Sequence, residues 1–198
     1  TFLFGSELKS LKTHPSFINE IDSQSLSNFI YTGFITQSKS IYKDISKLDP
    51  GSILTLNSSN NSCKISKYWD SESLIMSSTS NIFKGTELEA SQLLEDLLGN
   101  VLSEQMMADV PLGAFLSGGV DSSLIVALMQ KQSSSKIKTF TIGFDDKKYN
   151  EAIYAKDVAN YLKTDHTEVY LSSKDALETV PLLPELYDEP FADSSQIP

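Results

Sequence analysis

The sequence predicts an α/β protein, in which a parallel, doubly wound sheet follows a β-rich segment. From Val110 onward, short apolar strand patterns alternate with helical patterns, which is typical of a parallel sheet with helices on both faces. Before residue 70, turn signals separate strand patterns and little helix is expected. The 198 residues are 40% hydrophobic, which is enough for one sizeable core or two small ones.

The first 70 residues are expected to form strands, with one short helix between them. Strand patterns occupy residues 1–7, 52–56 and 64–69. The last two flank a polar stretch over 57–62 whose composition is that of a hairpin tip or loop. The helix is expected over 25–31, with Ser25 or Ser27 as its N-cap.

A change in composition separates this part from the rest of the chain. Residues 71–81 are rich in serine and weakly patterned, so we expect domains over 1–70 and 86–198, joined by a linker over 71–85. The second domain opens with a capping-box pattern, in which Glu89 follows Thr86 by three residues. Leucines then recur at helical spacing, which predicts a helix from about Glu87 to Met107.

Strands and helices alternate in the remaining sequence. Strands are expected over 112–116, 138–144 and 166–171, and helices over 122–131, over 150–163 and from about Ser173. In such a sheet, ligands bind where the strands end and the helices begin. The string FLSGGVDSS, residues 115–123, lies at such a point.

This string has the features of a phosphate-binding turn. Gly118 and Gly119 let the backbone turn sharply and approach a ligand closely. The N-terminus of the following helix offers free N–H groups and a positive dipole end. Ser117, Ser122 and Ser123 add hydroxyl donors. The pattern therefore favours an anion, most simply a phosphate.

The carboxylate of Asp121 would repel a phosphate bound at this turn. A divalent cation between the two groups removes this repulsion. Magnesium is commonly held by one or two carboxylates together with phosphate oxygens. The simpler alternative is an ordinary strand–helix turn, in which Asp121 caps the helix. The full string between two buried segments favours the metal and pyrophosphate site. A Walker motif, GxxxxGK[ST], is absent, which argues against ordinary γ-phosphate transfer.

Composition excludes several other classes of function. The net charge is −10, so a nucleic-acid partner is not expected. All 16 basic residues are lysines, so a phosphate has no arginine to bind it. No apolar run is long enough to span a membrane. Cys63 is the only cysteine, which fits a reducing compartment, and cytoplasm is the expected location.

The string SGGVDSS resembles the pyrophosphate loop of ATP pyrophosphatases with an adenine nucleotide alpha hydrolase-like fold. Its flanks, residues 108–113 and 187–195, look like those of asparagine synthetases. Residues 4–11 are similar to a segment late in the class II glutaminase domain of glutamine-dependent asparagine synthetases. The resemblance implies two partial domains of one enzyme, in the family's order.

The resemblance implies ATP and Mg²⁺ as cofactors and a two-step ligation. Aspartate is adenylated to β-aspartyl-AMP with release of pyrophosphate, and ammonia from glutamine, or free ammonia, then gives asparagine. The residues implied to contact the pyrophosphate are Ser117, Gly118, Gly119, Asp121 and Ser122, with Asp121 holding the metal. Leu116, Ile142 and Gly143 are implied to line the adenine pocket. Asp188, Glu189 and Asp193 are implied to form an active-site acidic cluster, for which a solvated loop is the alternative.

Three further expectations concern activity and partners. The family's glutaminase nucleophile is an N-terminal cysteine, so a chain that starts at Thr1 is expected to hydrolyse no glutamine by itself and to make no asparagine. Two partial domains leave apolar faces uncovered, so a homodimer is another expectation. Two rivals remain: a related amidoligase or beta-lactam-synthetase-like enzyme that adenylates another carboxylate, and a non-catalytic nucleotide-binding module.

Overall fold

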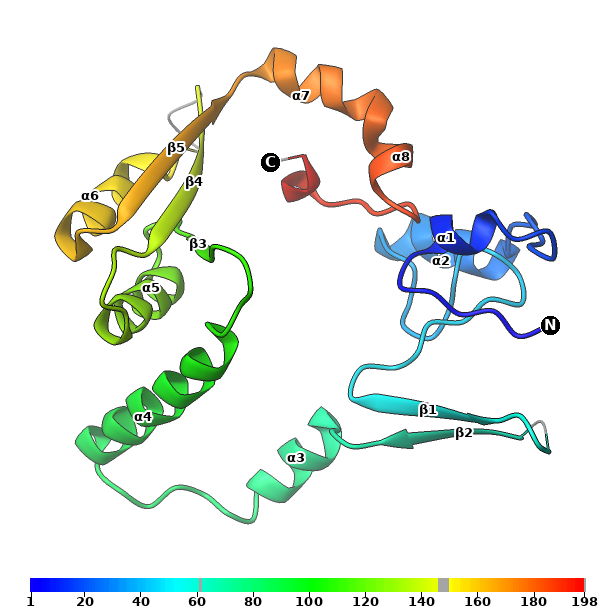
Figure 1. The fold of residues 1–198 in the computed structure, drawn as a ribbon, viewed down its shortest axis with the longest axis horizontal. Helices are drawn as coiled ribbons and strands as arrows, with labels where there is room; N and C mark the ends of the chain where they lie inside the picture. The colour runs from blue at the N-terminus through cyan, green and yellow to red at the C-terminus, as the bar shows by residue number, and fades with distance from the viewer. Residues whose placement is uncertain (61, 146–149, 198) are drawn as a thin grey trace. The chain divides into compact units, whose positions relative to one another are not determined.

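The chain forms two compact units in the computed structural model, which describes residues 1–60, 62–145 and 150–197 (Figure 1). The first unit contains residues 1–82 and 178–197, and the second contains residues 83–177. This division differs from the expected domains over 1–70 and 86–198, because the chain returns to the first unit near its C-terminal end. Those domain boundaries remain a prediction.

The first unit has short helices and one hairpin. The helices are α1 (Leu8–Lys12), α2 (Ser23–Thr32), α3 (Ser71–Ser78) and α8 (Leu183–Leu186), with 3₁₀ turns at Val180–Leu182 and Ser194–Gln196. The helix α7 (Ser173–Thr179) leads into this unit from the second. The predicted pair of strands is confirmed as an antiparallel hairpin of β1 (Ser52–Asn57) and β2 (Ser62–Lys67), in which Ser52 faces Lys67.

Three expectations for this unit differ from the structure. The predicted strand over residues 1–7 is wrong, because none of these residues is in a strand, and α1 begins directly after them. The N-cap of α2 is Asp22, whose carboxylate accepts a hydrogen bond from the Ser25 N–H at 2.7 Å, so neither Ser25 nor Ser27 is the cap. The expected linker contains α3, capped by Asp70.

The second unit is an α/β layer built on three parallel strands. They are β3 (Gly113–Phe115), β4 (Lys138–Phe144) and β5 (Asp165–Leu171), in that order across the sheet. The helices are α4 (Glu87–Gln105), α5 (Val120–Gln132) and α6 (Ala152–Leu162). The α/β class, the parallel sheet and the alternation of elements are therefore confirmed.

The helices α5 and α6 pack on one face of this sheet. Consecutive parallel strands joined by right-handed crossovers place both connecting helices on the same side. One buried cluster joins Leu116, Val126, Ala155 and Ala159 from β3's end, α5 and α6. The opposite face carries Phe115, which is 81% exposed. Helices on both faces were expected, whereas these two cover only one.

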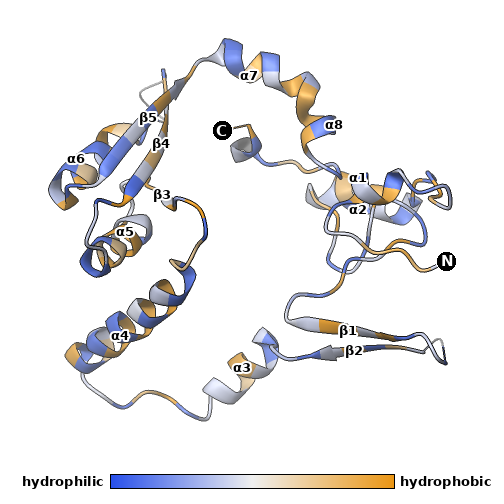
Figure 2. Ribbon diagram, in the orientation of Figure 1, coloured by the Kyte–Doolittle hydropathy of each residue, from blue (hydrophilic) through white to orange (hydrophobic). Residues whose placement is uncertain are grey.

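A second buried cluster joins α4 to α5. It consists of Leu102, Leu128, Met129 and Ile137, with Leu98 and Met106 packed against it. The predicted leucine stripe of α4 is broader than this contact, because Leu88, Leu93, Leu94 and Leu97 are exposed. Apolar and polar residues accordingly alternate around α4 in Figure 2. In the described ranges, no helix combines the length and apolar character needed to cross a membrane.

Stability is expected to fall in acid, because carboxylates at helix starts are held in their charged form. The Thr86 N–H, and after it the Thr86 hydroxyl, lower the pKa of Glu89 below its ordinary 4.5. A carboxyl group whose pKa is lower in the folded than in the unfolded protein stabilises the fold at a pH above its unfolded pKa. This stabilisation is lost as the pH falls through its folded pKa. Melting temperatures measured from about pH 6 to pH 2 test this effect.

The matched variants are Glu89→Gln and Glu87→Gln, two exposed glutamates in the first turn of α4. Glu89→Gln is expected to weaken the decline of melting temperature below pH 4.5, since the titrating cap is gone. Glu87→Gln is the control, because it removes the same charge from the same turn and leaves the hydrogen bonds between Thr86 and Glu89 in place. Equal slopes for all three proteins would contradict the capping account.

Candidate functional site

The candidate site, residues 116–122, consists of the loop that follows β3 and the first turn of α5, and is called the loop below. It begins from a strand end that is bound to the neighbouring strand. Leu116 is 2% exposed, and its N–H donates to the Phe140 carbonyl at 2.9 Å. The hydroxyl of Thr141 donates to the Leu116 carbonyl from the neighbouring strand. Both backbone groups of Leu116 are therefore bound to β4, so the loop leaves the sheet in a defined direction.

Gly118 is the residue that the turn requires to be glycine. Its φ is +81°, in the left-handed region that side chains disfavour. A Cβ there would also lie 2.7 Å from the Ala155 nitrogen and from the Tyr154 carbonyl carbon, at the start of α6. The loop thus leads into the first turn of α5 and lies against the first turn of α6. The sequence motif pointed to Gly118 but not to Tyr154 or Ala155, because this contact is 36 residues away along the chain.

The serines of the loop bind one another. The Ser117 and Ser122 hydroxyls share a hydrogen bond of 2.9 Å, and the Ser117 hydroxyl accepts from the Gly119 N–H at 3.3 Å. Gly119 is the N-cap of α5 and has no side chain to accept from the helix's first turn. The N–H groups of that turn and two hydroxyls are therefore gathered on one loop, as an anion site requires.

Asp121 lies in the first turn of α5 and is exposed. Within residues 1–60, 62–145 and 150–197, no three His, Cys, Asp or Glu residues are grouped so that they could hold a metal ion. A cation at Asp121 would therefore need oxygen ligands from a bound molecule. This donor set fits Mg²⁺, which takes few protein carboxylates and completes its shell with phosphate oxygens and water.

Ile142 and Gly143 occupy the carboxyl-terminal part of β4, but on opposite faces. Gly143 is on the face covered by helices and buried; a Cβ on it would lie 3.1 Å from the Cβ of Ala152 and 2.6 Å from the Tyr170 ring. Ile142 pairs with Val169 on the open face. Gly143 therefore lies at the start of α6, and the role of both residues at adenine stays a prediction.

Tyr170 is a neighbour of this position that the sequence did not single out. Its hydroxyl donates to Glu168 at 2.8 Å, and Lys156 of α6 pairs with the same carboxylate at 3.1 Å. The Tyr170 hydrogen bond, and then that of Lys156, lower the pKa of Glu168, while its bond to Glu168 raises the pKa of Tyr170. The sequence held one signal for the contact between Glu168 and Tyr170. They are two residues apart on one strand, so their side chains lie on the same face.

The three acidic residues near the C-terminal end lie in the first unit and bind groups there. Asp188 and Glu189 each accept hydrogen bonds from backbone N–H groups of the N-terminal segments. Asp193 accepts hydrogen bonds from the hydroxyl and the N–H of Ser195. Both bonds lower the pKa of Asp193, the hydroxyl more than the N–H. Their grouping as an active-site cluster stays a prediction.

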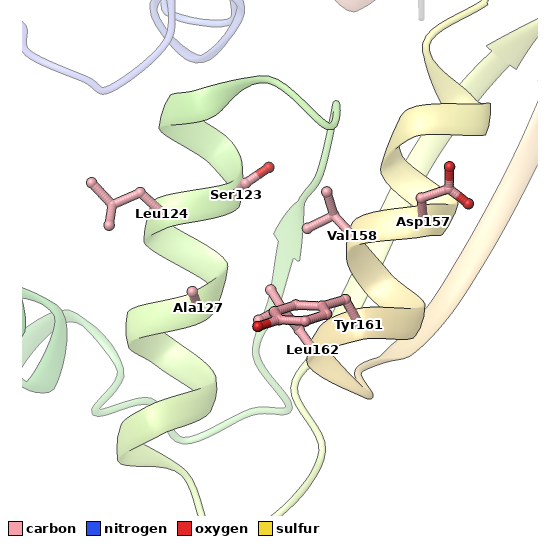
Figure 3. A pocket seen from close by; sticks show the side chains of 7 residues that line it. All are labelled: Ser123, Leu124, Ala127, Asp157, Val158, Tyr161 and Leu162. Carbon is pink, nitrogen blue, oxygen red and sulfur yellow. The ribbon is translucent and has the colours of Figure 1, made fainter.

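A hollow of about 500 Å³ lies between α5 and α6, but it has a different character (Figure 3). It is lined by Ser123, Leu124, Ala127, Asp157, Val158, Tyr161 and Leu162. Most of these side chains are apolar, and the glycines of the loop are not among them. The loop has the donors that a phosphate needs, and it remains the candidate site.

Two family models match the chain and together cover most of it. The model described as asparagine synthase matches residues 93–198, which include the loop, and the model of the glutamine amidotransferase domain matches residues 1–69.

Individual relatives have corresponding names. A putative asparagine synthetase [glutamine-hydrolyzing] 2 of Methanocaldococcus jannaschii is 35% identical over all of this chain. Asparagine synthetase [glutamine-hydrolyzing] 1 of Bacillus subtilis is 29% identical over 98% of it. The asparagine synthetase [glutamine-hydrolyzing] of Rattus norvegicus is 33% identical over 54% of it. The chain spans 37%, 29% and 20% of the lengths of these relatives.

Substituting alanine at the two loop glycines should have unequal effects on stability. Gly118→Ala introduces a Cβ in the left-handed conformation and against the backbone of α6. We expect it to lower the free energy of unfolding by about 1–3 kcal/mol or more. Gly119→Ala is the control: its φ is −71°, and its Cβ would meet nothing nearer than the Ser117 hydroxyl at 3.4 Å. It should cost at most about 1 kcal/mol.

Urea denaturation of the wild type and both variants measures these differences. Equal loss of stability in the two variants, or none in Gly118→Ala, would show that the turn and its contact with α6 are not as described.

Proposed function

The chain belongs to the asparagine synthase family, and on that premise we propose that it is the ATP-binding part, with a portion of the amidotransferase part, of a glutamine-dependent asparagine synthetase. The complete enzyme adenylates aspartate to β-aspartyl-AMP and then converts it to asparagine with ammonia from glutamine. The observation that carries the proposal is the loop of residues 116–122. It combines a left-handed glycine, two linked serine hydroxyls and an uncapped helix start with one exposed carboxylate.

The first step needs a site for the departing pyrophosphate. The β-carboxylate of aspartate attacks the α-phosphorus of ATP, and the bond to the β-phosphate oxygen breaks. The N–H groups of α5's first turn and the hydroxyls of Ser117 and Ser122 are suited to stabilise the negative charge on pyrophosphate. Bound Mg²⁺ would neutralise part of the same charge, with Asp121 as its protein ligand.

The adenosine end is proposed to lie at the carboxyl ends of the first two strands. Leu116 and Gly143 are both buried there, and Ile142 adjoins them on the open face. Gly143 lets the start of α6 and the Tyr170 ring come close to β4. These positions can line a pocket for a base, which is consistent with the rule that ligands bind outside the strand ends of such sheets.

In the second step, ammonia attacks the β-carbonyl of β-aspartyl-AMP, and AMP leaves. The match of residues 1–69 to a glutamine amidotransferase domain supports glutamine as the nitrogen source. We assign no role in glutamine hydrolysis to Cys63, which is free and exposed on β2. We place the enzyme in the cytoplasm, with aspartate, glutamine and ATP as its ligands, and consider a homodimer its assembly.

The substrate carboxylate is tested by the exchange of labelled pyrophosphate into ATP. We expect the complete enzyme to catalyse exchange only when aspartate is present, because the reverse reaction needs an acyl-adenylate. Exchange with a different carboxylate would keep the adenylation chemistry and replace aspartate. Folded enzyme that binds Mg²⁺-ATP and exchanges with none of the carboxylates would favour a non-catalytic nucleotide-binding module.

The metal assignment is tested by Asp121→Asn in the complete enzyme. We expect aspartate-dependent exchange to fall by about 100-fold or more, because a preorganised charge at the reacting phosphates is lost. We also expect ATP binding, measured by calorimetry, to lose its response to Mg²⁺. Asp157→Asn is the control, since it removes an exposed carboxylate from α6 outside the loop. Binding that still responds to Mg²⁺ in Asp121→Asn would contradict the assignment.

A further inference from the structure

The segment over residues 186–197 belongs by sequence to the asparagine synthase match, but in the structure it binds residues of the glutamine amidotransferase match. It lies within the asparagine synthase match, residues 93–198. Its hydrogen-bond partners include groups at residues 8, 9, 33 and 41, which lie within the glutamine amidotransferase match, residues 1–69. All of these contacts are within the first unit.

Asp188 binds the start of α1. Its Oδ2 accepts from the Leu8 N–H at 2.6 Å, and its Oδ1 accepts from the Lys9 N–H at 3.2 Å. Glu7, the residue at the N-cap position, makes no capping hydrogen bond with its side chain. A carboxylate 180 residues away therefore takes the role that a local N-cap normally has.

Glu189 binds the loop that precedes β1. Its Oε1 accepts from the Ile41 N–H at 2.7 Å, and its Oε2 pairs with the Lys47 ammonium. The Glu189 side chain is only 12% exposed, and Ile41 is 5% exposed. A carboxylate this far from water needs such partners, because desolvation strongly disfavours an unpaired charge.

Backbone contacts extend the same attachment. The Ala192 N–H donates to the Gly33 carbonyl at 2.8 Å, where Gly33 ends α2 in the left-handed conformation. The Tyr187 hydroxyl donates to the Gln196 carbonyl at 2.7 Å, which holds the segment in a compact shape. The segment is thus fixed to α1, to the end of α2 and to the loop before β1.

We propose that Asp188 and Glu189 are positioning residues that join the synthase part of the chain to its amidotransferase part. All four of their carboxylate oxygens bind protein N–H or ammonium groups, so their function is to fasten the segment rather than to bind substrate. This inference rests on the proposed function. Hydrolysis of glutamine by water gives glutamate and ammonia, and the ammonia then displaces AMP from the acyl-adenylate to form the amide. We expect a loosened joint to uncouple the two reactions, so that part of the ammonia reaches solvent before it is used.

The test uses the complete enzyme with Asp188→Asn and Glu189→Gln. The first substitution leaves one acceptor oxygen for two N–H groups, and the second removes the negative charge opposite Lys47. With glutamine as donor, we expect the glutamate formed in excess of asparagine to rise about fivefold, because losing one ordinary hydrogen bond raises the population of the loosened state by about that factor. Synthesis from ammonium chloride and aspartate-dependent pyrophosphate exchange should stay at wild-type levels.

Glu185→Gln is the matched control, because it removes the same charge from an exposed position in α8. It should leave the glutamate-to-asparagine ratio unchanged. Loss of pyrophosphate exchange in the Asp188 and Glu189 variants, with wild-type melting temperatures, would instead assign these residues to the substrate site. An unchanged ratio in both variants would also overturn the inference.

Amide hydrogen exchange separates this inference from the proposed function. In Asp188→Asn, the Leu8 and Lys9 amides are expected to exchange faster, whereas the Glu185→Gln control should leave them unchanged. This readout does not depend on any activity. If the wild type fails to exchange pyrophosphate with aspartate, the proposed function is wrong, but the joint is still tested by these amides; if they keep wild-type protection, the joint is wrong.

Discussion

The close contact between Gly118 and the start of α6 is the constraint on which the candidate site depends. The backbone of the loop and the backbone of α6 meet where even one methyl group would lie 2.7 Å from main-chain atoms. This contact, made at a φ of +81°, brings the loop at α5's start close to the first turns of α6. Two helix starts then face the same strand ends, where their dipoles favour an anion.

The strands supply the rigidity behind that contact. Buried threonines of β4 face the helices, and each has a polar partner. Thr141 donates to the Leu116 carbonyl, and the Thr139 hydroxyl bonds to Thr164 and His166, each at 2.9 Å. Polar groups that are satisfied in this way specify one register across the sheet. A phosphate site needs such order, because donors that are already in place lose little entropy on binding.

The acidic motif near the C-terminal end has a different physical basis from the loop. Family resemblance singled out Asp188 and Glu189 together with the residues of the loop, but a resemblance does not separate groups that touch substrate from groups that hold the fold. The hydrogen bonds of the two groups differ. Asp121 is exposed at a helix start, whereas both oxygens of Glu189 are bound by the chain itself.

The sequence by itself determined the features that depend on near neighbours. The capping box at Thr86, the hairpin of β1 and β2 and the whole of β4 follow from patterns within a few residues, because capping, turn and pleat geometry act over that distance. The tertiary structure alone decided that residues 1–7 pair with no strand and that Asp188 caps α1. Such contacts join segments up to 180 residues apart, and no local pattern specifies which distant group satisfies an N–H.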